Sequence, residues 1–213
     1  MHSGKRSAAA REAKRDRIKA VAQALFAEGG LKNVSTRDII SAAGYRNTTL
    51  INYYFGSKAA LIDELINDVA TSLSQHRQQE LAQLKAQGGP GIRDLLVLLA
   101  TPAPVTGLSE EAAKSRTRFT AMLLIYHRDS LFLSGMYRKD TGTALCIREL
   151  RRLLPRKRGL TDRINLVLLM FVAALVNDEV ENAGDGPPAS LRIRNKNAVI
   201  DAAIAILTGP AGA

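Results

Sequence analysis

The chain has 213 residues, of which 46% are hydrophobic, and its 30 Lys and Arg against 20 Asp and Glu give a formal charge of +10. The hydrophobic content excludes a largely disordered chain, and the positive charge favours a polyanionic partner such as nucleic acid. The charge is unevenly spread, because residues 1–58 hold 11 basic and 4 acidic residues, or +7 of the +10.

The cysteine content and the length of the apolar runs indicate the cellular compartment. Cys146 is the only cysteine, so the chain has no internal disulfide and shows no sign of an oxidising compartment. The longest apolar run, residues 166–176, is shorter than the about 20 residues that cross a bilayer, and no N-terminal run resembles a signal peptide. We therefore expect a cytoplasmic protein with no membrane partner.

The N-terminal region predicts a basic arm followed by an amphipathic helix. Residues 1–10 are typical of a disordered basic tail. From residue 11 to the Gly29-Gly30 pair, apolar residues recur with the spacing of one helix face: Ile18, Val21, Ala22, Leu25 and Phe26. The first half of this helix also carries five cations, which form either a solvated face or a set of phosphate contacts: Arg11, Lys14, Arg15, Arg17 and Lys19.

Residues 35–58 predict two short helices joined by a tight turn. Ser35 is a good helix N-cap, and Asp38 stands three residues later, near the positive end of that helix. Gly44 supplies the break, since a residue without Cβ tolerates left-handed geometry. The next segment, residues 46–54, is rich in Arg, Asn, Thr and Tyr, and Phe55 closes it with an apolar anchor. This layout is typical of a helix-turn-helix, whose second helix enters the DNA major groove.

The rest of the chain predicts further helices and no strands, because no alternating pattern exceeds a few residues. A long helix starts at Lys58 and ends near Gln87, before the break at residues 88–91. Shorter helices are expected over residues 92–100, about 110–128, about 130–154, about 161–182 and about 190–207. The predicted fold is all-α, with about nine helices.

Several motifs in order resemble the tetracycline-repressor (TetR) family of bacterial transcription regulators: Ala24-Leu25-Phe26, Ser35-Thr36-Arg37-Asp38-Ile39, Ala42-Ala43-Gly44 and Tyr53-Tyr54-Phe55-Gly56-Ser57-Lys58. The segment from the turn to Phe55 is one residue longer than in many members. The resemblance implies a three-helix DNA-binding domain over residues 11–57 and an effector-binding and dimerisation domain over residues 58–213.

Ten residues of the predicted helix-turn-helix are candidates for DNA contact: Thr36, Arg37, Arg46, Asn47, Thr48, Thr49, Asn52, Tyr53, Tyr54 and Lys58. Tyr packs on a thymine methyl or reaches a base edge, Arg serves a phosphate or guanine, and Asn pairs with adenine. Lys58 starts a helix, where free N–H groups already favour a phosphate. For Thr48 and Thr49, plain capping is an equal alternative to DNA contact.

A single helix-turn-helix domain, called the reader below, buries little DNA surface and so has modest sequence specificity. Two copies that bind half-sites one DNA turn apart gain specificity, so a homodimer is expected. The last two predicted helices are apolar enough to pair with a second copy, or alternatively to be buried within one subunit. The candidate interface residues are Leu166, Leu169, Met170, Ala173, Val176, Val199, Ile200 and Ile204.

The middle helices, about residues 92–154, are the expected effector site, since they hold large side chains and adaptable Met residues. The candidates are Arg118, Phe119, Met122, Tyr126, His127, Met136 and Tyr137. A further basic set either grips an anionic ligand such as a coenzyme A thioester or forms a solvated helix end: Arg148, Arg151, Arg152, Arg156, Lys157 and Arg158.

These features predict a ligand-responsive, DNA-binding transcriptional repressor, which a small and mostly apolar effector releases from its operator. No catalytic set, metal site or cofactor is expected. The alternative is an α-helical enzyme or adaptor acting on a lipid-like or acyl-CoA-like molecule. An enzyme needs a paired catalytic set in the middle helices, where His127 and Asp129 lack a Ser or Cys nucleophile in a recognisable motif.

Overall fold

The computed structural model describes residues 3–103, 109–127, 140–181 and 196–210. Within these ranges the chain forms nine helices and no strand, which confirms the all-α fold. The helices are α1 (Ser3–Asn33), α2 (Thr36–Ala42), α3 (Thr49–Phe55), α4 (Lys58–Ala86), α5 (Ile92–Ala100), α6 (Glu110–Tyr126), α8 (Gly142–Leu153), α9 (Leu160–Glu181) and α10 (Lys196–Thr208).

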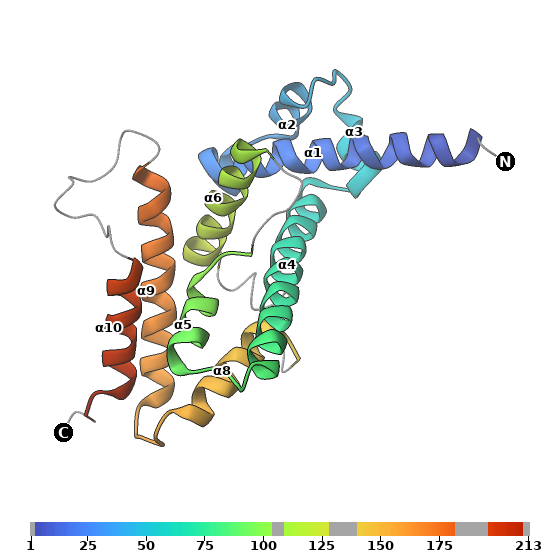
Figure 1. Cartoon of the computed structure of the whole chain (residues 1–213). Helices are drawn as coiled ribbons and strands as arrows, with labels where there is room; N and C mark the ends of the chain where they lie inside the picture. The colour runs from blue at the N-terminus through green and yellow to red at the C-terminus, as the bar shows by residue number, and fades with distance from the viewer. Residues whose placement is uncertain (1–2, 104–108, 128–139, 182–195, 211–213) are drawn as a thin grey trace.

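Two hydrophobic cores lie one after the other along α4. The first joins α1, α2 and α3 to the first half of α4, and Phe119 of α6 stacks on Phe26 of α1 with ring centroids 6.5 Å apart. The second joins the end of α4 to α5, α8, α9 and α10. In Figure 1, α1 crosses one end of the molecule, α4 leads away from it, and α9 and α10 lie side by side along one edge. The first core therefore extends past the predicted domain boundary at residue 58.

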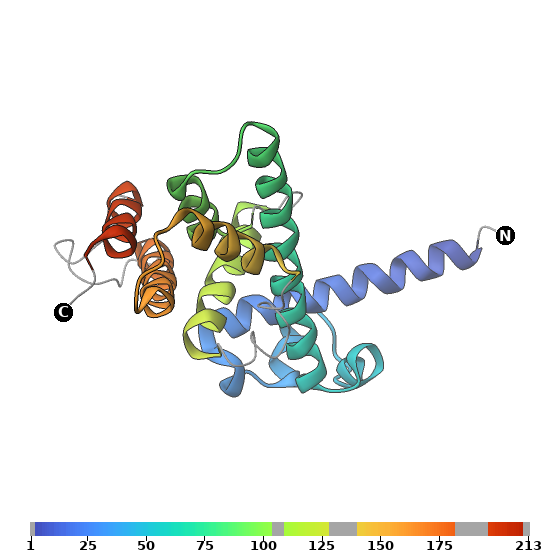
Figure 2. The same ribbon diagram turned by 90° about the horizontal axis from the view of Figure 1, so that it is seen from below.

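Helix α1 differs from the sequence prediction at its start. Residues 3–10 were expected to be a disordered arm, but the helix begins at Ser3 and projects beyond the rest of the molecule (Figure 2). Disorder was therefore the wrong prediction for residues 3–10, because Ala8–Ala10 have the highest intrinsic helix propensity and continue the helix that follows. The predicted break is present at Gly30, whose φ of 75° and ψ of 162° kink the chain before Asn33.

The C-terminal helices agree with the sequence prediction except near residue 140. A single helix was expected over residues 130–154, whereas α8 begins at Gly142, with the hydroxyl of Thr141 capping it by accepting a hydrogen bond from Ala144. Residues 128–139 and 182–195 lie outside the described ranges, so the first part of that helix and the start of the last predicted helix are not compared. None of the described helices is long and apolar enough to cross a membrane.

Candidate nucleic-acid interface

Helix α2 begins with a reciprocal capping box, as its sequence predicts. The backbone N–H of Asp38 donates to the Ser35 hydroxyl at 3.2 Å, and the backbone N–H of Ser35 donates to the Asp38 carboxylate at 2.8 Å. The Ser35 hydroxyl also donates to the Asp38 carboxylate at 2.7 Å, and this bond, followed by the one from the Ser35 backbone N–H, holds the pKa of Asp38 below its usual value. The helix ends at Ala42, and the left-handed Gly44, with φ of 80°, turns the chain so that the Tyr45 N–H donates to the Ile40 carbonyl. The start and end of α2 are thus both fixed by local bonds.

The start of α3 depends on Asn47 rather than on Thr48. The side-chain oxygen of Asn47 accepts from the Thr49 backbone N–H at 3.0 Å and from the Thr49 hydroxyl at 2.7 Å, while Thr48 makes no side-chain cap bond. An Asn needs both its oxygen and its amide N–H to pair with adenine. Because the Asn47 oxygen is already used twice, Asn52 is the better candidate for that pairing.

Helix α3 buries one side and exposes the other. Ile51 is fully buried in the first core, and Leu50 and Phe55 pack against that core. Tyr53 is 63% exposed and meets the ring of Tyr54 edge-on, with centroids 4.9 Å apart. Tyr53 is therefore a surface side chain on the exposed side of α3.

The exposed face of α3 lies beside the N-terminal half of α1. The Arg11 guanidinium stands 5.3 Å from the centre of the Tyr53 ring, and the Arg17 guanidinium stands 6.0 Å from the Tyr45 ring. Both arginines are exposed. Both belong to the five cations of the first helix for which phosphate contact is one of two interpretations. Helix α1 carries Arg11 beside Tyr53 of α3, and Arg17 beside Tyr45 in the turn before α3.

Two other cations of that group have a structural partner instead. Arg15 and Lys19 both bind the Glu64 carboxylate of α4, and Lys19 also binds Asp68 at 2.5 Å. Burial alone lowers the pKa of Lys19, but its hydrogen bonds to Asp68 and Glu64 outweigh that effect and raise it. These two residues join α1 to α4, so the solvated-face and phosphate interpretations are both wrong for them.

The predicted DNA-contact residues gather around α2, α3 and the start of α4. Seven are exposed: Arg37, Arg46, Asn47, Thr48, Thr49, Asn52 and Tyr53. Three are half-buried: Thr36, Tyr54 and Lys58. The Lys58 ammonium stands 5.7 Å from the centre of the Phe26 ring, which holds it at the first turn of α4. Arg11 and Arg17 of α1 lie on the same surface as these ten predicted residues.

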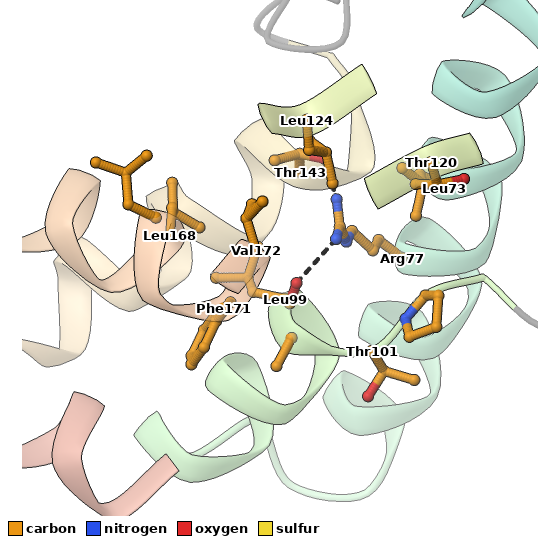
Figure 3. Close-up of a pocket in the computed structure, with 13 residues that line it drawn as sticks. Leu73, Arg77, Leu99, Thr101, Thr120, Leu124, Thr143, Leu168, Phe171 and Val172 are labelled. Carbon is orange, nitrogen blue, oxygen red and sulfur yellow. Dashed lines mark hydrogen bonds between the residues drawn. The ribbon is translucent and has the colours of Figure 1, made fainter. Parts of the chain in front are cut away.

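A cavity of about 60 Å³ lies between α4, α5, α6, α8 and α9. Its wall is mostly apolar, but Arg77 of α4 is buried there and donates to the Leu99 carbonyl at 2.9 Å and to the Thr143 hydroxyl at 2.6 Å. Figure 3 shows Arg77 reaching from α4 towards the end of α5, opposite Phe171 and Val172 of α9. A role for Arg77 was not predicted, because nothing in the neighbouring sequence distinguishes it from a surface residue of a long polar helix.

None of the predicted effector residues that the structure describes lines this cavity. Phe119 is fully buried in the first core, Met122 packs against that core, and Tyr126 is 75% exposed. Arg118 and His127 are half-buried outside the cavity wall, while Met136 and Tyr137 lie outside the described residues. Helix α6 turns Phe119 and Met122 to the first core, and only Thr120 and Leu124 to the cavity.

The predicted dimer residues divide into two sets. On α9, Leu166 and Leu169 are 54% and 45% exposed, Ala173 is exposed and Met170 is half-buried. On α10, Val199 and Ile200 are buried within the protomer, where they pack in the second core, so they were wrongly placed at the interface. Ile204 also packs against that core, and the Val176 side chain lies outside the described residues.

Comparisons with known proteins agree on one class. A sequence profile of the bacterial regulatory proteins of the tetR family matches residues 18–65. The TetR family transcriptional regulator PfmR from Thermus thermophilus has a similar structure, with a TM-score of 0.57 and 17% identity, covering 92% of this chain and 100% of that chain. A putative TetR-family transcriptional regulator from Mesorhizobium loti gives a TM-score of 0.49 at 16% identity, covering 92% of this chain and 97% of that one. No curated protein sequence matches the chain.

A helix-turn-helix with a capped first helix and an exposed polar second helix, followed by a helical body, defines a DNA-binding transcriptional regulator. Residues 18–65 match the bacterial regulatory proteins of the tetR family, and the fold of the chain is similar to that of a TetR-family regulator. The matched residues include the motifs between residues 24 and 58, so the match supports the resemblance that these motifs predict.

Proposed function

We propose that two copies of the chain bind an operator through α3, and that a small effector bound in the helical body releases them. The observation that carries the proposal is the two-sided character of α3, where buried Ile51 anchors the helix while Asn52 and Tyr53 are presented to solvent. A short helix held in this way can enter the major groove without exposing its core. Repression follows if the operator overlaps a promoter.

Each contact residue has a role set by its chemistry. Tyr53 and Asn52 read bases, Arg46 reads a guanine edge or a phosphate, and Arg37 holds a phosphate. Lys58 adds its charge to the N-terminus of α4, where the helix dipole already attracts a phosphate. Arg11 and Arg17 of α1 add phosphate contacts beside α3, since both are exposed and lie against the rings of Tyr53 and Tyr45.

The effector proposal is supported by the chemistry and size of the cavity. Its apolar wall with the buried Arg77 suits a mostly apolar molecule that carries one hydrogen-bond acceptor, such as a carbonyl or carboxylate. Its volume of about 60 Å³ is smaller than the roughly 300 Å³ or more of a typical ligand pocket, so the effector must separate the surrounding helices. Binding would therefore favour a second packing of the body.

Helix α4 is the element that would carry this change to the DNA. It begins at Lys58 beside the first core and carries Arg77 in the cavity wall, and its 29 residues span about 40 Å. A tilt of α4 away from α9 moves both readers of a dimer out of register with their half-sites. All phosphate contacts of a reader are then lost together.

The DNA-binding proposal is tested by the salt dependence of binding to duplex DNA. Lys58→Ala should weaken binding to all sequences and lower the slope of log affinity against log salt concentration by about 0.9 per protomer, whereas Lys58→Arg should keep the slope. An unchanged slope in Lys58→Ala would remove this residue from the interface.

The effector proposal is tested on the purified protein. Small molecules released on denaturation are identified by mass spectrometry and added back to the protein–DNA complex, which should dissociate. Arg77→Met should keep DNA binding but lose the response, and the milder Thr120→Val tests the same wall if Arg77→Met fails to fold. A molecule that dissociates the complex equally well in both variants binds elsewhere.

A further inference from the structure

A second concentration of positive charge lies between the end of α8 and the start of α9. Residues 148–163 hold seven basic residues and two acidic ones, or +5, while residues 59–213 hold 19 and 16, or only +3. The remainder of the C-terminal part is therefore −2. We call the basic residues of this segment the distal patch: Arg148, Arg151, Arg152, Arg156, Lys157, Arg158 and Arg163.

Two members of the distal patch have a structural role. Lys157 donates to the Thr208 carbonyl at 2.9 Å, and Arg163 donates to the Ile206 carbonyl at 2.9 Å and the Gly209 carbonyl at 2.8 Å. Cations at the end of α10 satisfy its last carbonyls and the negative end of its dipole. Stability of the fold therefore accounts for these two charges.

Two of the other five members have a polar partner within the same segment. Arg152 binds Glu149 and Arg151 donates to the Thr161 hydroxyl at 3.2 Å. The remaining three, Arg148, Arg156 and Arg158, are exposed and have no hydrogen-bond or ion-pair partner within the part of the chain that the structure describes. Like charges gathered in one segment repel one another, so an anion bound among them would be stabilising.

A shallow hollow of about 500 Å³ opens within the distal patch. Arg151, Arg156 and Lys157 line it together with the first turn of α9, which carries the positive end of the dipole of a 22-residue helix. Asp162 is the one carboxylate in its wall, so the lining is net +2. Guanidinium forks match the geometry of phosphate oxygens, and no aromatic side chain in the lining offers a base-stacking surface.

The distal patch lies at the end of the molecule opposite α2 and α3 (Figure 1). Helix α4, which spans about 40 Å, separates the two ends. A duplex bound by α3 is therefore not the same duplex segment that meets the distal patch.

We propose that the distal patch binds the phosphodiester backbone of a second duplex DNA segment, without sequence preference, so that an operator-bound protein holds two segments. The cations extend beyond the hollow to Arg148, Arg152 and Arg158, over a wider surface than one small phosphate ligand covers. Leu153 is the one exposed large apolar residue within the segment, which gives a membrane little to insert. A duplex is also the polyanion that the regulator already meets.

The test uses the full chain with a weakened helix-turn-helix, Arg37→Ala with Lys58→Ala, and measures binding to a random duplex by fluorescence anisotropy at several salt concentrations. This variant should retain salt-sensitive binding. Adding Arg156→Gln and Arg158→Gln should weaken that binding about tenfold or more at low salt and lower the salt slope by about 2. Adding Arg93→Gln and Lys114→Gln, which removes the same charge from exposed pairs elsewhere, should leave the slope unchanged.

Competition and bridging distinguish the source of the phosphate. A duplex immobilised on beads and loaded with wild-type protein should capture a second, labelled duplex, and Arg156→Gln with Arg158→Gln should abolish the capture. The proposal is overturned if residual binding is indifferent to these substitutions, or if the patch binds inorganic triphosphate or phosphatidylserine vesicles but no duplex. Sequence-selective binding by the wild-type protein is measured separately. Its absence would contradict the operator proposal, whereas loss of duplex capture alone would contradict the proposal for the distal patch.

Discussion

At the scale of single residues, the side chains of α3 that can contact bases differ from those that hold the helix in place. Tyr53 is the side chain most available to a base, whereas Tyr54 is half-buried and Asn47 is engaged in capping. The residue types in this segment predicted a DNA-binding helix. They did not predict whether Asn47 or Asn52 has its side-chain oxygen available for a base. That distinction depends on hydrogen bonds between Asn47 and Thr49, which composition and spacing do not reveal.

Tyr53→Ala should change the sequence preference of the reader more than its general affinity. Loss of one base contact is worth about 1–3 kcal/mol at the base it reads, while phosphate contacts remain. Selection of bound duplexes from a random pool should give a degenerate base at one position of each half-site. Tyr53→Phe, which keeps the ring, should retain contact with a thymine methyl, and an unchanged selected sequence in Tyr53→Ala would show that Tyr53 does not read bases.

Glu149 should stabilise the protein only above acidic pH. Its carboxylate is buried and accepts a hydrogen bond from Lys85 at 2.6 Å, which lowers the pKa of Glu149 below its usual value. Since the folded pKa lies below the unfolded one of about 4.3, the stabilisation is full above that value and is lost as pH falls through the folded pKa.

Glu149→Gln should therefore lower the free energy of unfolding by about 1–2 kcal/mol at neutral pH and by progressively less below about pH 4. Urea melts across this range measure the difference. Glu110→Gln is the matched control, because its carboxylate pairs with Lys114 at the surface with 84% of the side chain exposed, and should have a smaller effect. A pH-independent loss in Glu149→Gln would contradict the assigned pair.

At the scale of elements, α4 and α8 meet at a position that only glycine fits. A Cβ on Gly142 would stand 2.2 Å from the Ser74 carbonyl oxygen and 2.8 Å from Arg77 Cβ. The Gly142 N–H also donates to the Ser74 hydroxyl at 3.0 Å. The start of α8 thus packs directly against α4 next to the cavity wall.

Gly142→Ala should force α4 and α8 apart and lower the thermal midpoint by several degrees, since the contacting atoms are backbone and cannot turn aside. Overpacking of this kind costs about 1–3 kcal/mol. Ser74→Ala, which removes only the hydroxyl, is the control and should cost less. A fully stable Gly142→Ala would mean that the two helices are not this close.

The helices whose ends carry strong local signals were predictable from the sequence. Ser35, Ser57 and the Gly88-Gly89 pair set the ends of α2 and α4 close to the predicted residues. The start of α1 was missed because helix propensity outweighed a basic, small-residue composition. The cavity was missed because it is formed by residues from five helices, a tertiary arrangement that no local pattern encodes.

At the scale of the whole molecule, the exposed apolar side of α9 is the surface on which the proposed dimer depends. Leu166 is 54% exposed and Leu169 is 45% exposed, on a helix whose other side packs in the second core. The sequence showed that α9 and α10 were apolar, but not which side of each was covered by its own protomer. Val199 and Ile200 were misassigned for this reason.

Leu166→Glu should dissociate the dimer. Each protomer would bury an unpaired carboxylate at a cost of a few kcal/mol, which weakens association by about a hundredfold or more. Sedimentation velocity measures the change, and Gln79→Glu on the exposed side of α4 is the control. A monomeric wild-type protein, or a Leu166→Glu dimer of unchanged affinity, would place the interface elsewhere.

The central claim, that α3 reads DNA from the major groove in a two-fold assembly, is tested most directly by methylation interference on a selected duplex. Methylation of guanine N7 blocks the major groove, and methylation of adenine N3 blocks the minor groove. The account predicts interference at guanines in two half-sites related by two-fold symmetry and separated by one helical turn or a multiple of it. Interference at adenine N3 alone, or at a single site, would contradict it.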